Sequence, residues 1–274
     1  MPVSTEGILV DIGANLAHDS FDHDRHAVIA RAAEAGVERI VVTGSTVASS
    51  RAALGIAKAF PGRLFSTAGV HPHHAAEFGP ETAPLLVEIA TDPLVVAIGE
   101  CGLDYFRQLS PRPAQQRAFV RQLGLAAAMG KPVFLHQRDA HSDFLAILRE
   151  QMADLVGGVA HCFTGTRQQM DAYLELGLYI GVTGWICDER RGNDLRAAVS
   201  ALPLDRVLLE TDAPYLLPRT MSAAISGRRN EPAFLPAVLD TTARCMGTSA
   251  AELAILSARN SERLFGLPSL GSDR

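Results

Sequence analysis

Four segments of this chain each end an apolar run with a side chain that can bind a metal ion. The segments are Val95-Val-Ala-Ile-Gly-Glu100, Pro132-Val-Phe-Leu-His136, Gly158-Val-Ala-His161 and Val207-Leu-Leu-Glu-Thr-Asp212. A carboxylate or an imidazole at the end of a buried strand is costly to desolvate unless another group binds it. Four such endings predict a ring of ligands at one end of a parallel barrel, where catalytic groups lie in that fold. The pattern therefore favours metal-assisted hydrolysis.

The ligand types narrow the choice of metal. Glu100 and Asp212 supply oxygen donors, whereas His136 and His161 supply imidazole nitrogens. This mixture suits zinc, manganese or cobalt, and also magnesium if water and phosphate complete the coordination shell. Each residue alone has a simpler explanation, because a core histidine can be hydrogen-bonded and an acidic residue can cap the following helix. All four residues together favour the metal site.

Another apolar run, the third predicted strand along the chain, ends with two further histidines in the segment Gly69-Val-His-Pro-His-His74. His71 and His73 are candidates for metal ligands, donors to a substrate phosphate or proton shuttles. His74 is expected to be solvated. A purely structural His-Pro-His turn is the alternative.

The chain must position these residues with alternating strands and helices. The strand-like runs are Gly7–Ile12, Arg39–Thr43, Leu64–Val70, Leu94–Glu100, Pro132–His136, Gly158–His161, Leu178–Thr183 and Arg206–Glu210. Most are continuous apolar runs, which is typical of strands buried on both faces. Helical patterns between them include Arg25–Ala35, Thr46–Ala59, Ala114–Met129, Ser142–Arg149, Thr166–Leu176 and Asn193–Ala201.

The eightfold alternation predicts an α/β fold of the (β/α)8 TIM-barrel type, in the form found in metal-dependent hydrolases. An open doubly wound sheet is the rival fold, but no GxGxxG motif follows the first run. We expect one barrel domain over residues 1–274, because such barrels have about 250 residues. Residues 266–274 are expected to form a loose tail.

Composition excludes several classes of protein. No segment reaches the roughly 18 uninterrupted apolar residues of a membrane span, and no secretory signal is visible at the N-terminus. The four cysteines are scattered without CxxC spacing, which is typical of reduced thiols. A net charge of −5 argues against a passive nucleic-acid coat protein but allows a local basic rim. We expect a cytoplasmic monomer that does not associate with membranes.

The predicted ligand side of the barrel is rich in arginine. Its arginines are Arg107, Arg112, Arg138, Arg190, Arg191, Arg219, Arg228 and Arg229. Guanidinium groups bind phosphate with two parallel hydrogen bonds, so this rim suits nucleic acid, although several of these arginines are expected only to pair with neighbouring acids. Tyr105, Phe106 and Trp185 could stack on bases or plug the barrel mouth. The absence of a duplex-reading motif favours single strands or frayed ends.

Several stretches of the chain resemble the TatD family of metal-dependent deoxyribonucleases, which belongs to the amidohydrolase-like barrels. The matching stretches are Asp11-Ile-Gly-Ala-Asn-Leu16, Ser66-Thr-Ala-Gly-Val-His-Pro-His73, Ala97-Ile-Gly-Glu-Cys-Gly-Leu-Asp104, Phe134-Leu-His-Gln-Arg-Asp-Ala-His141, His161-Cys-Phe-Thr-Gly165, Thr183-Gly-Trp-Ile-Cys-Asp-Glu-Arg-Arg-Gly192, Leu209-Glu-Thr-Asp-Ala-Pro-Tyr-Leu-Leu217 and Arg228-Arg-Asn-Glu-Pro232. Together with the ending Asn260-Ser-Glu-Arg-Leu-Phe-Gly266, they span nearly the whole chain.

The resemblance implies that Glu100, His136 and His161 bind one or two divalent ions, with Asp212 beside them as the catalytic acid or base. Magnesium is the expected metal, with manganese and zinc as alternatives. It further implies 3′–5′ exonuclease action on ends of single-stranded DNA or RNA, in DNA repair or nucleic-acid turnover. We take His71 as the second catalytic candidate. The candidates for substrate binding are His73, Asn15, Arg138, Arg228 and Arg229.

One departure concerns the first strand. Much of the wider family carries a His-x-His pair at its end, where this chain has Gly13-Ala14-Asn15. The TatD branch shares this form, which removes two nitrogen ligands from the more buried metal position. Asn15 is a candidate contact for water or phosphate, with a simple turn residue as the alternative.

Two other functions remain open. A metal-dependent amide, lactone or phosphotriester hydrolase would share the same four ligand candidates. It would have little use for the arginine rim or for the long loop Pro214–Pro232. The second alternative is a binding protein that has lost catalysis, which the missing histidine pair favours.

Overall fold

Eight strands alternate with helices along the chain. The computed structural model describes residues 9–221 and 227–270. The strands are β1 Leu9–Ala14, β2 Val37–Val42, β3 Leu64–Ala68, β4 Val95–Asp104, β5 Val133–Arg138, β6 Gly158–Ala160, β7 Tyr179–Val182 and β8 Val207–Leu209. They form one sheet in chain order, from β1 to β8. All eight predicted strands are confirmed, although the first predicted strand begins outside the described residues.

Each strand is followed by a helix. The helices are α1 Arg25–Glu34, α2 Val47–Ala59, α3 Thr82–Ala90, α4 Arg112–Met129, α5 His141–Gln151, α6 Arg167–Glu175, α7 Asn193–Val199, α8 Leu235–Met246 and α9 Ala250–Phe265. This order is that of a (β/α)8 barrel, with α9 added after the last repeat. None of the described helices is long and apolar enough to cross a membrane.

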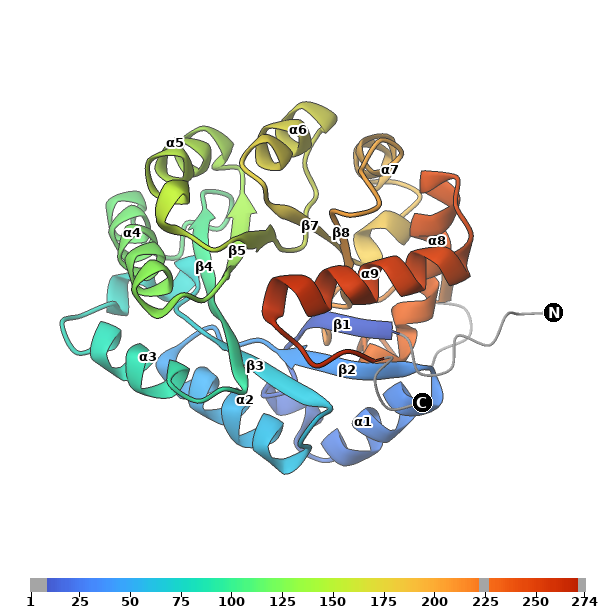
Figure 1. Cartoon of the computed structure of the whole chain (residues 1–274), viewed down its shortest axis with the longest axis horizontal. Helices are drawn as coiled ribbons and strands as arrows, with labels where there is room; N and C mark the ends of the chain where they lie inside the picture. Colours follow the sequence, from blue (N-terminus) through green and yellow to red (C-terminus); the bar gives the residue numbers. More distant parts are fainter. Residues whose placement is uncertain (1–8, 222–226, 271–274) are drawn as a thin grey trace. The chain divides into compact units, whose positions relative to one another are not determined.

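Two compact units can be distinguished, and the first contains the two ends of the sheet. It comprises the described residues of Met1–Val41, Cys162–Asp171 and Ile180–Arg274. Ala14 forms a parallel bridge with Ala213, and the Asp212 N–H donates to the Gly13 carbonyl at 2.8 Å. The segment after β8 therefore pairs with the end of β1. Helix α9 covers both strands (Figure 1).

The second unit comprises Val42–His161 and Ala172–Tyr179. Strands β3, β4, β5 and β6 pair in parallel, with Ser66 opposite Val95, Ile98 opposite Val133 and Leu135 opposite Ala160. Helices α4 and α5 lie side by side (Figure 1). Between them the fully buried rings of Phe119 and Phe144 stack at 5.3 Å. The carboxyl ends of four neighbouring strands therefore lie next to one another in this unit.

Strand β4 is longer than the sequence predicts. It continues past Glu100 to Asp104, and its pairing with β5 shifts between Ile98 and Cys101. Gly99 and Gly102 make this continuation feasible, because a Cβ at either position would collide with a backbone carbonyl of β5. Both glycines have positive φ, of 139° and 143°, which side chains rarely allow. Glu100 therefore lies inside the strand, at an irregularity of the kind that re-aims side chains near active sites.

The predicted loose tail at residues 266–274 is wrong for its described part. Leu267 is buried, and the Leu270 N–H donates to Glu262 at 2.6 Å. The buried Arg39 side chain donates to the Pro268 carbonyl. These contacts hold residues 267–270 against the rest of the first unit. The Pro268 carbonyl is retained there because a buried guanidinium needs hydrogen-bond acceptors. Residues 271–274 lie outside the described part of the chain.

Candidate metal centre and active site

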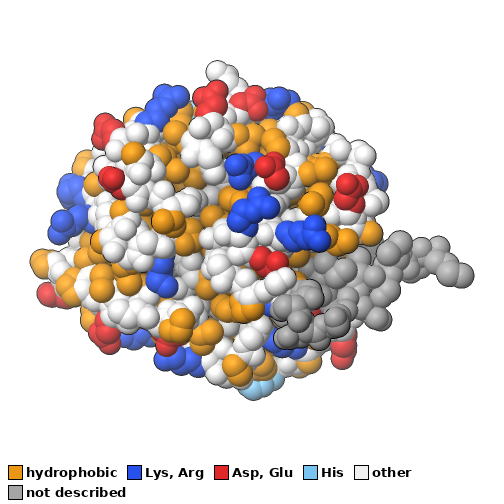
Figure 2. Space-filling view, in the orientation of Figure 1, with side chains coloured by type: hydrophobic (Ala, Val, Ile, Leu, Met, Phe, Trp, Pro, Cys, Tyr) orange, Lys and Arg blue, Asp and Glu red, His pale blue; other side chains and the backbone are white. Residues whose placement is uncertain are grey.

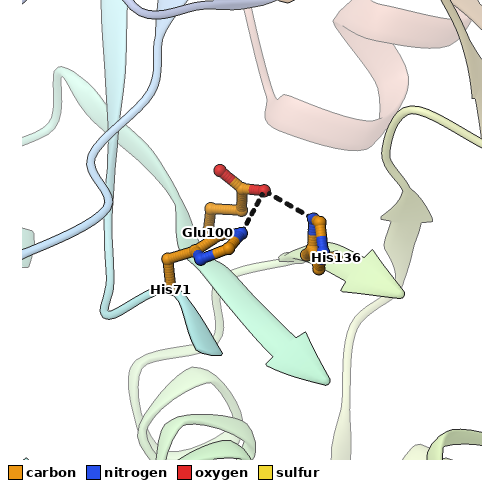
Figure 3. A group of neighbouring side chains, drawn as sticks. All are labelled: His71, Glu100 and His136. Atoms are coloured by element: carbon orange, nitrogen blue, oxygen red, sulfur yellow. Dashed lines mark hydrogen bonds and ion pairs between the residues drawn. The ribbon is translucent and has the colours of Figure 1, made fainter. Parts of the chain in front are cut away.

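Three imidazoles surround one carboxylate oxygen in the second unit. Glu100 Oε1 lies 3.0 Å from His136 Nδ1, 3.4 Å from His71 Nε2 and 3.7 Å from His161 Nε2. Figure 3 shows the dashed lines from His71 and His136 meeting at this oxygen. The structure therefore brings together the three predicted ligands of this unit and adds His71 to them.

Neighbouring strands explain this convergence. His71 follows β3, Glu100 lies in β4, His136 lies in β5 and His161 follows β6. Because these strands pair in chain order, their carboxyl ends meet at one edge. The Glu100 N–H donates to the Gly44 carbonyl at 2.7 Å, which fixes the backbone at the irregular part of β4.

The charges of the cluster suit a cation. Burial alone would raise the pKa of Glu100, but the imidazoles of His71, His136 and His161 hold it well below its usual range. The ligand atoms of His71, Glu100 and His136 lie within 4.8 Å of one another. One carboxylate among several imidazoles is a donor set that fits zinc, manganese or, with added oxygen ligands, magnesium. The residues present can thus hold a divalent ion.

His71 is held as a neutral imidazole with a defined tautomer. Its Nδ1 accepts the backbone N–H of His73 at 3.1 Å, so its proton lies on Nε2, which faces Glu100. Burial lowers the pKa of His71 to about 3. His71 is therefore suited to donating a hydrogen bond and not to acting as a cationic acid.

Asp104 is a buried carboxylate that is not among the site residues predicted from the sequence. Its Oδ2 lies 2.9 Å from His73 Nε2 and 3.2 Å from His136 Nε2. Its Oδ1 accepts the Arg107 N–H at 2.7 Å. A signal was present, because Asp104 closes the stretch Ala97–Asp104 that carries Glu100.

A second group of polar side chains lies in the first unit, around Asp212. Asp212 has a left-handed backbone with φ +55°, which aspartate tolerates better than most residues. The Asn15 side-chain amide donates to Asp212 Oδ1 at 3.1 Å. Asp11 accepts from both the N–H and the hydroxyl of Thr211, and Asn230 donates to the Thr211 carbonyl at 2.9 Å. Asn15 thus orients the predicted catalytic carboxylate, a contact that the sequence did not predict.

The aromatic candidates separate into buried and exposed residues. Tyr105 is buried, and its hydroxyl donates to Asp143 at 2.8 Å, which favours the packing alternative over stacking on bases for this residue. Phe106 is 56% exposed, and the Arg138 guanidinium lies 4.3 Å from its ring centre. Phe106 therefore exposes an aromatic ring to solvent, with the Arg138 guanidinium packed against that ring. Trp185 is half-buried beneath the Arg191 guanidinium.

The arginine rim is partly neutralised. Figure 2 shows one face of the molecule, on which Lys and Arg side chains are mixed with Asp and Glu; the neutralisation of the rim itself follows from its ion pairs. Arg190 and Arg191 both pair with Asp188. Arg229 donates to both carboxylate oxygens of Asp24, at 2.8 and 2.6 Å, so it forms an ion pair, as expected for several of these arginines, but with a partner far away in the sequence. Arg228 is exposed and has no hydrogen-bond or ion-pair partner among residues 9–221 and 227–270.

Comparison with known proteins identifies the family. The sequence model of a family described as TatD related DNase matches residues 10–266. The chain belongs to this family. A curated relative from Pantoea vagans, named 3′-5′ ssDNA/RNA exonuclease TatD, is 51% identical over 259 residues, which cover 94% of this chain and 100% of the relative.

Solved structures of the family share the fold. A TatD family hydrolase from Entamoeba histolytica has a TM-score of 0.86 at 26% identity, covering 97% of this chain and 100% of its own. A TatD homologue from Escherichia coli has the same TM-score at 29% identity, covering 96% and 99%. The predicted (β/α)8 barrel and the predicted family are both confirmed.

Proposed function

We propose that this chain is a metal-dependent 3′–5′ exonuclease that hydrolyses phosphodiester bonds at the ends of single-stranded DNA and RNA. The observation that carries the proposal is the convergence of three imidazoles on Glu100 Oε1, in a chain that aligns over its relatives' full length. Such a cluster of buried ionisable groups is expected at an active site and is costly elsewhere.

Glu100, His136 and His161 would hold the metal, and Asp212 stays the predicted catalytic acid or base. The (β/α)8 fold supports these roles, because the catalytic residues of such barrels come from the carboxyl ends of several strands. A divalent ion bound there would lower the pKa of an attacking water and offset the charge that develops on phosphate. Magnesium as the resident ion, with manganese and zinc as alternatives, stays a prediction, as does the choice between one ion and two.

The protein's own groups have distinct tasks in this scheme. The Asp212 carboxylate takes a proton from the attacking water, and the Asn15 amide holds it in position through Oδ1. The Nε2–H of His71 can donate a hydrogen bond to a phosphate oxygen. His73 is a candidate for a second phosphate contact, since Asp104 fixes its Nε2 and orients its ring.

Substrate contacts beyond the reacting phosphate are proposed for three residues. The exposed Phe106 ring can stack on a base while Arg138 lies against it. Arg228 is exposed and carries a charge without a described partner, so it can bind a phosphate of the strand. A phosphate contact by Arg229 stays a prediction, as do a monomeric state and a cytoplasmic location.

Cleavage polarity tests the proposal directly. A single strand labelled at its 5′ end should yield a ladder that shortens stepwise, because the site accepts one terminal nucleotide at a time. A 3′-phosphate or a recessed 3′ end should slow the reaction, as gel analysis of the products will show. Internal cuts in a circular single strand would contradict this mode of entry. A parallel panel of small amides, lactones and phosphotriesters should show no comparable turnover.

Arg228→Ala and Arg229→Ala should have different effects. Loss of Arg228 should raise the apparent KM and flatten its salt dependence by about 0.7 in log–log slope, the amount for one phosphate on a single strand. Loss of Arg229 breaks its ion pair with Asp24, in which both side chains are about one-third exposed, and should cost about 0.2–1 kcal/mol of unfolding free energy. KM at several salt concentrations and thermal unfolding separate the two. A salt dependence left unchanged by Arg228→Ala would remove that residue from the binding surface.

A further inference from the structure

Asp104 contacts two histidines through a single oxygen. Its Oδ2 lies 3.2 Å from Nε2 of His136 and 2.9 Å from Nε2 of His73, and its side chain is only 2% exposed. The opposite nitrogen of His136, Nδ1, lies 3.0 Å from Glu100 Oε1. His136 is thus fixed between two carboxylates, one on each ring nitrogen.

We propose that Asp104 is a positioning residue that fixes the His136 ring so that its Nδ1 is the metal-binding atom. This inference rests on the proposed metal site. A histidine that binds a metal through one nitrogen commonly donates its other N–H to a carboxylate, which fixes the tautomer and the ring orientation. Because Asp104 accepts the Nε2–H, a metal-bound His136 would offer the lone pair of Nδ1, the nitrogen that faces Glu100.

The backbone of Asp104 is held by two hydrogen bonds to the side chain of Gln115. The Asp104 N–H donates to Gln115 Oε1 at 2.8 Å, and Gln115 Nε2 donates back to the Asp104 carbonyl at 3.0 Å. Gln115 is fully buried on α4 and also donates to the Ser110 carbonyl. These bonds fix Asp104 where β4 ends, so its carboxylate can orient His136 in turn.

The hydrogen-bond pattern makes asparagine an informative substitution. Oδ1 of Asp104 accepts the Arg107 N–H at 2.7 Å, while Oδ2 faces the two imidazoles. An amide has one acceptor oxygen, so Asp104→Asn must turn its NH₂ either toward the Arg107 N–H or toward the imidazoles, where it would favour the His136 tautomer with its proton on Nδ1. The variant keeps the size of the side chain but cannot accept a hydrogen bond on both sides.

The first test measures metal affinity of the full chain by calorimetry with Mn²⁺ and needs no nucleic acid. Asp104→Asn should weaken binding by about 10- to 100-fold, the usual effect of removing the outer partner of a ligating histidine. Asp143→Asn is the matched control, because Asp143 accepts from Tyr105 and Gln116 and contacts no histidine within residues 9–221 and 227–270. Asp104→Asn binding Mn²⁺ as tightly as Asp143→Asn would overturn the inference.

The second test shows which histidine transmits the effect. Repeated in a His73→Ala background, Asp104→Asn should weaken Mn²⁺ binding by the same factor, because the effect runs through His136. Loss of the effect in that background would overturn the inference. In the Mg²⁺-loaded wild type, nitrogen NMR of labelled histidines should show His136 protonated on Nε2. A proton on Nδ1 would also overturn it.

The two proposals fail separately. Weaker Mn²⁺ binding by Asp104→Asn, in a protein that cleaves no nucleic acid, would uphold the role of Asp104 and reject the exonuclease. Metal-dependent cleavage by the wild type, with Mn²⁺ affinity unchanged in Asp104→Asn, would reject only the role of Asp104.

Discussion

Replacing Asp212 by asparagine should lower the turnover of single-stranded substrate by about 10²–10⁴, the usual range for loss of a general acid or base. The amide keeps the size of the side chain and an oxygen that can accept from Asn15, but it cannot take a proton. Binding should therefore be retained. Single-turnover rates and KM for a 5′-labelled strand measure the two effects separately.

Asp194→Asn is the matched control for this change, because Asp194 is an exposed residue of α7. It makes the same chemical substitution away from the site and should leave turnover unchanged. If Asp212→Asn turned over substrate at the wild-type rate, the base would have to lie elsewhere. Loss of binding together with turnover would instead indicate that Asp212 holds substrate.

Removal of the metal should abolish hydrolysis, and added Mg²⁺ or Mn²⁺ should restore it. The reason is that the donor atoms of Glu100, His136 and His161 converge on one place, where a divalent ion would be bound. His161→Ala should weaken metal binding by more than the roughly 10–100-fold that loss of an outer partner costs. Metal content and calorimetry check this expectation.

The fold should survive His161→Ala, because the stability of a barrel rests on its interior packing and not on the residues of its catalytic rim. Circular dichroism and thermal unfolding provide this control. Full activity in excess chelator would reject metal-assisted hydrolysis altogether. Loss of folded structure in His161→Ala would mean that the histidine is part of the core.

The strand positions could be predicted because each strand is a continuous apolar run that must be buried on both faces. Once strands pair in chain order, their ends must meet. Glu100, His136 and His161 were therefore predictable as neighbours, although they are far apart along the chain. The family resemblance was visible for the same reason, since the matching stretches lie at these strand ends.

The tertiary structure decided which neighbouring residues are buried and which are exposed. Tyr105 and Phe106 are adjacent and equally aromatic, yet Tyr105 is buried against Asp143 whereas Phe106 is exposed beside Arg138. Likewise, Arg228 and Arg229 differ only in their surroundings, because Arg229 meets Asp24, 205 residues away. No local pattern encodes such partners.

The sequence by itself determined the barrel order, the metal-ligand candidates and the family of this protein, because these depend on residue type and spacing. Only the tertiary structure decided that β4 continues to Asp104, that His71 carries its proton on Nε2 and that Asp104 holds His136. These features depend on strand register and on distances of about 3 Å between side chains of different elements. Residue type and spacing do not specify such distances until the strands are paired.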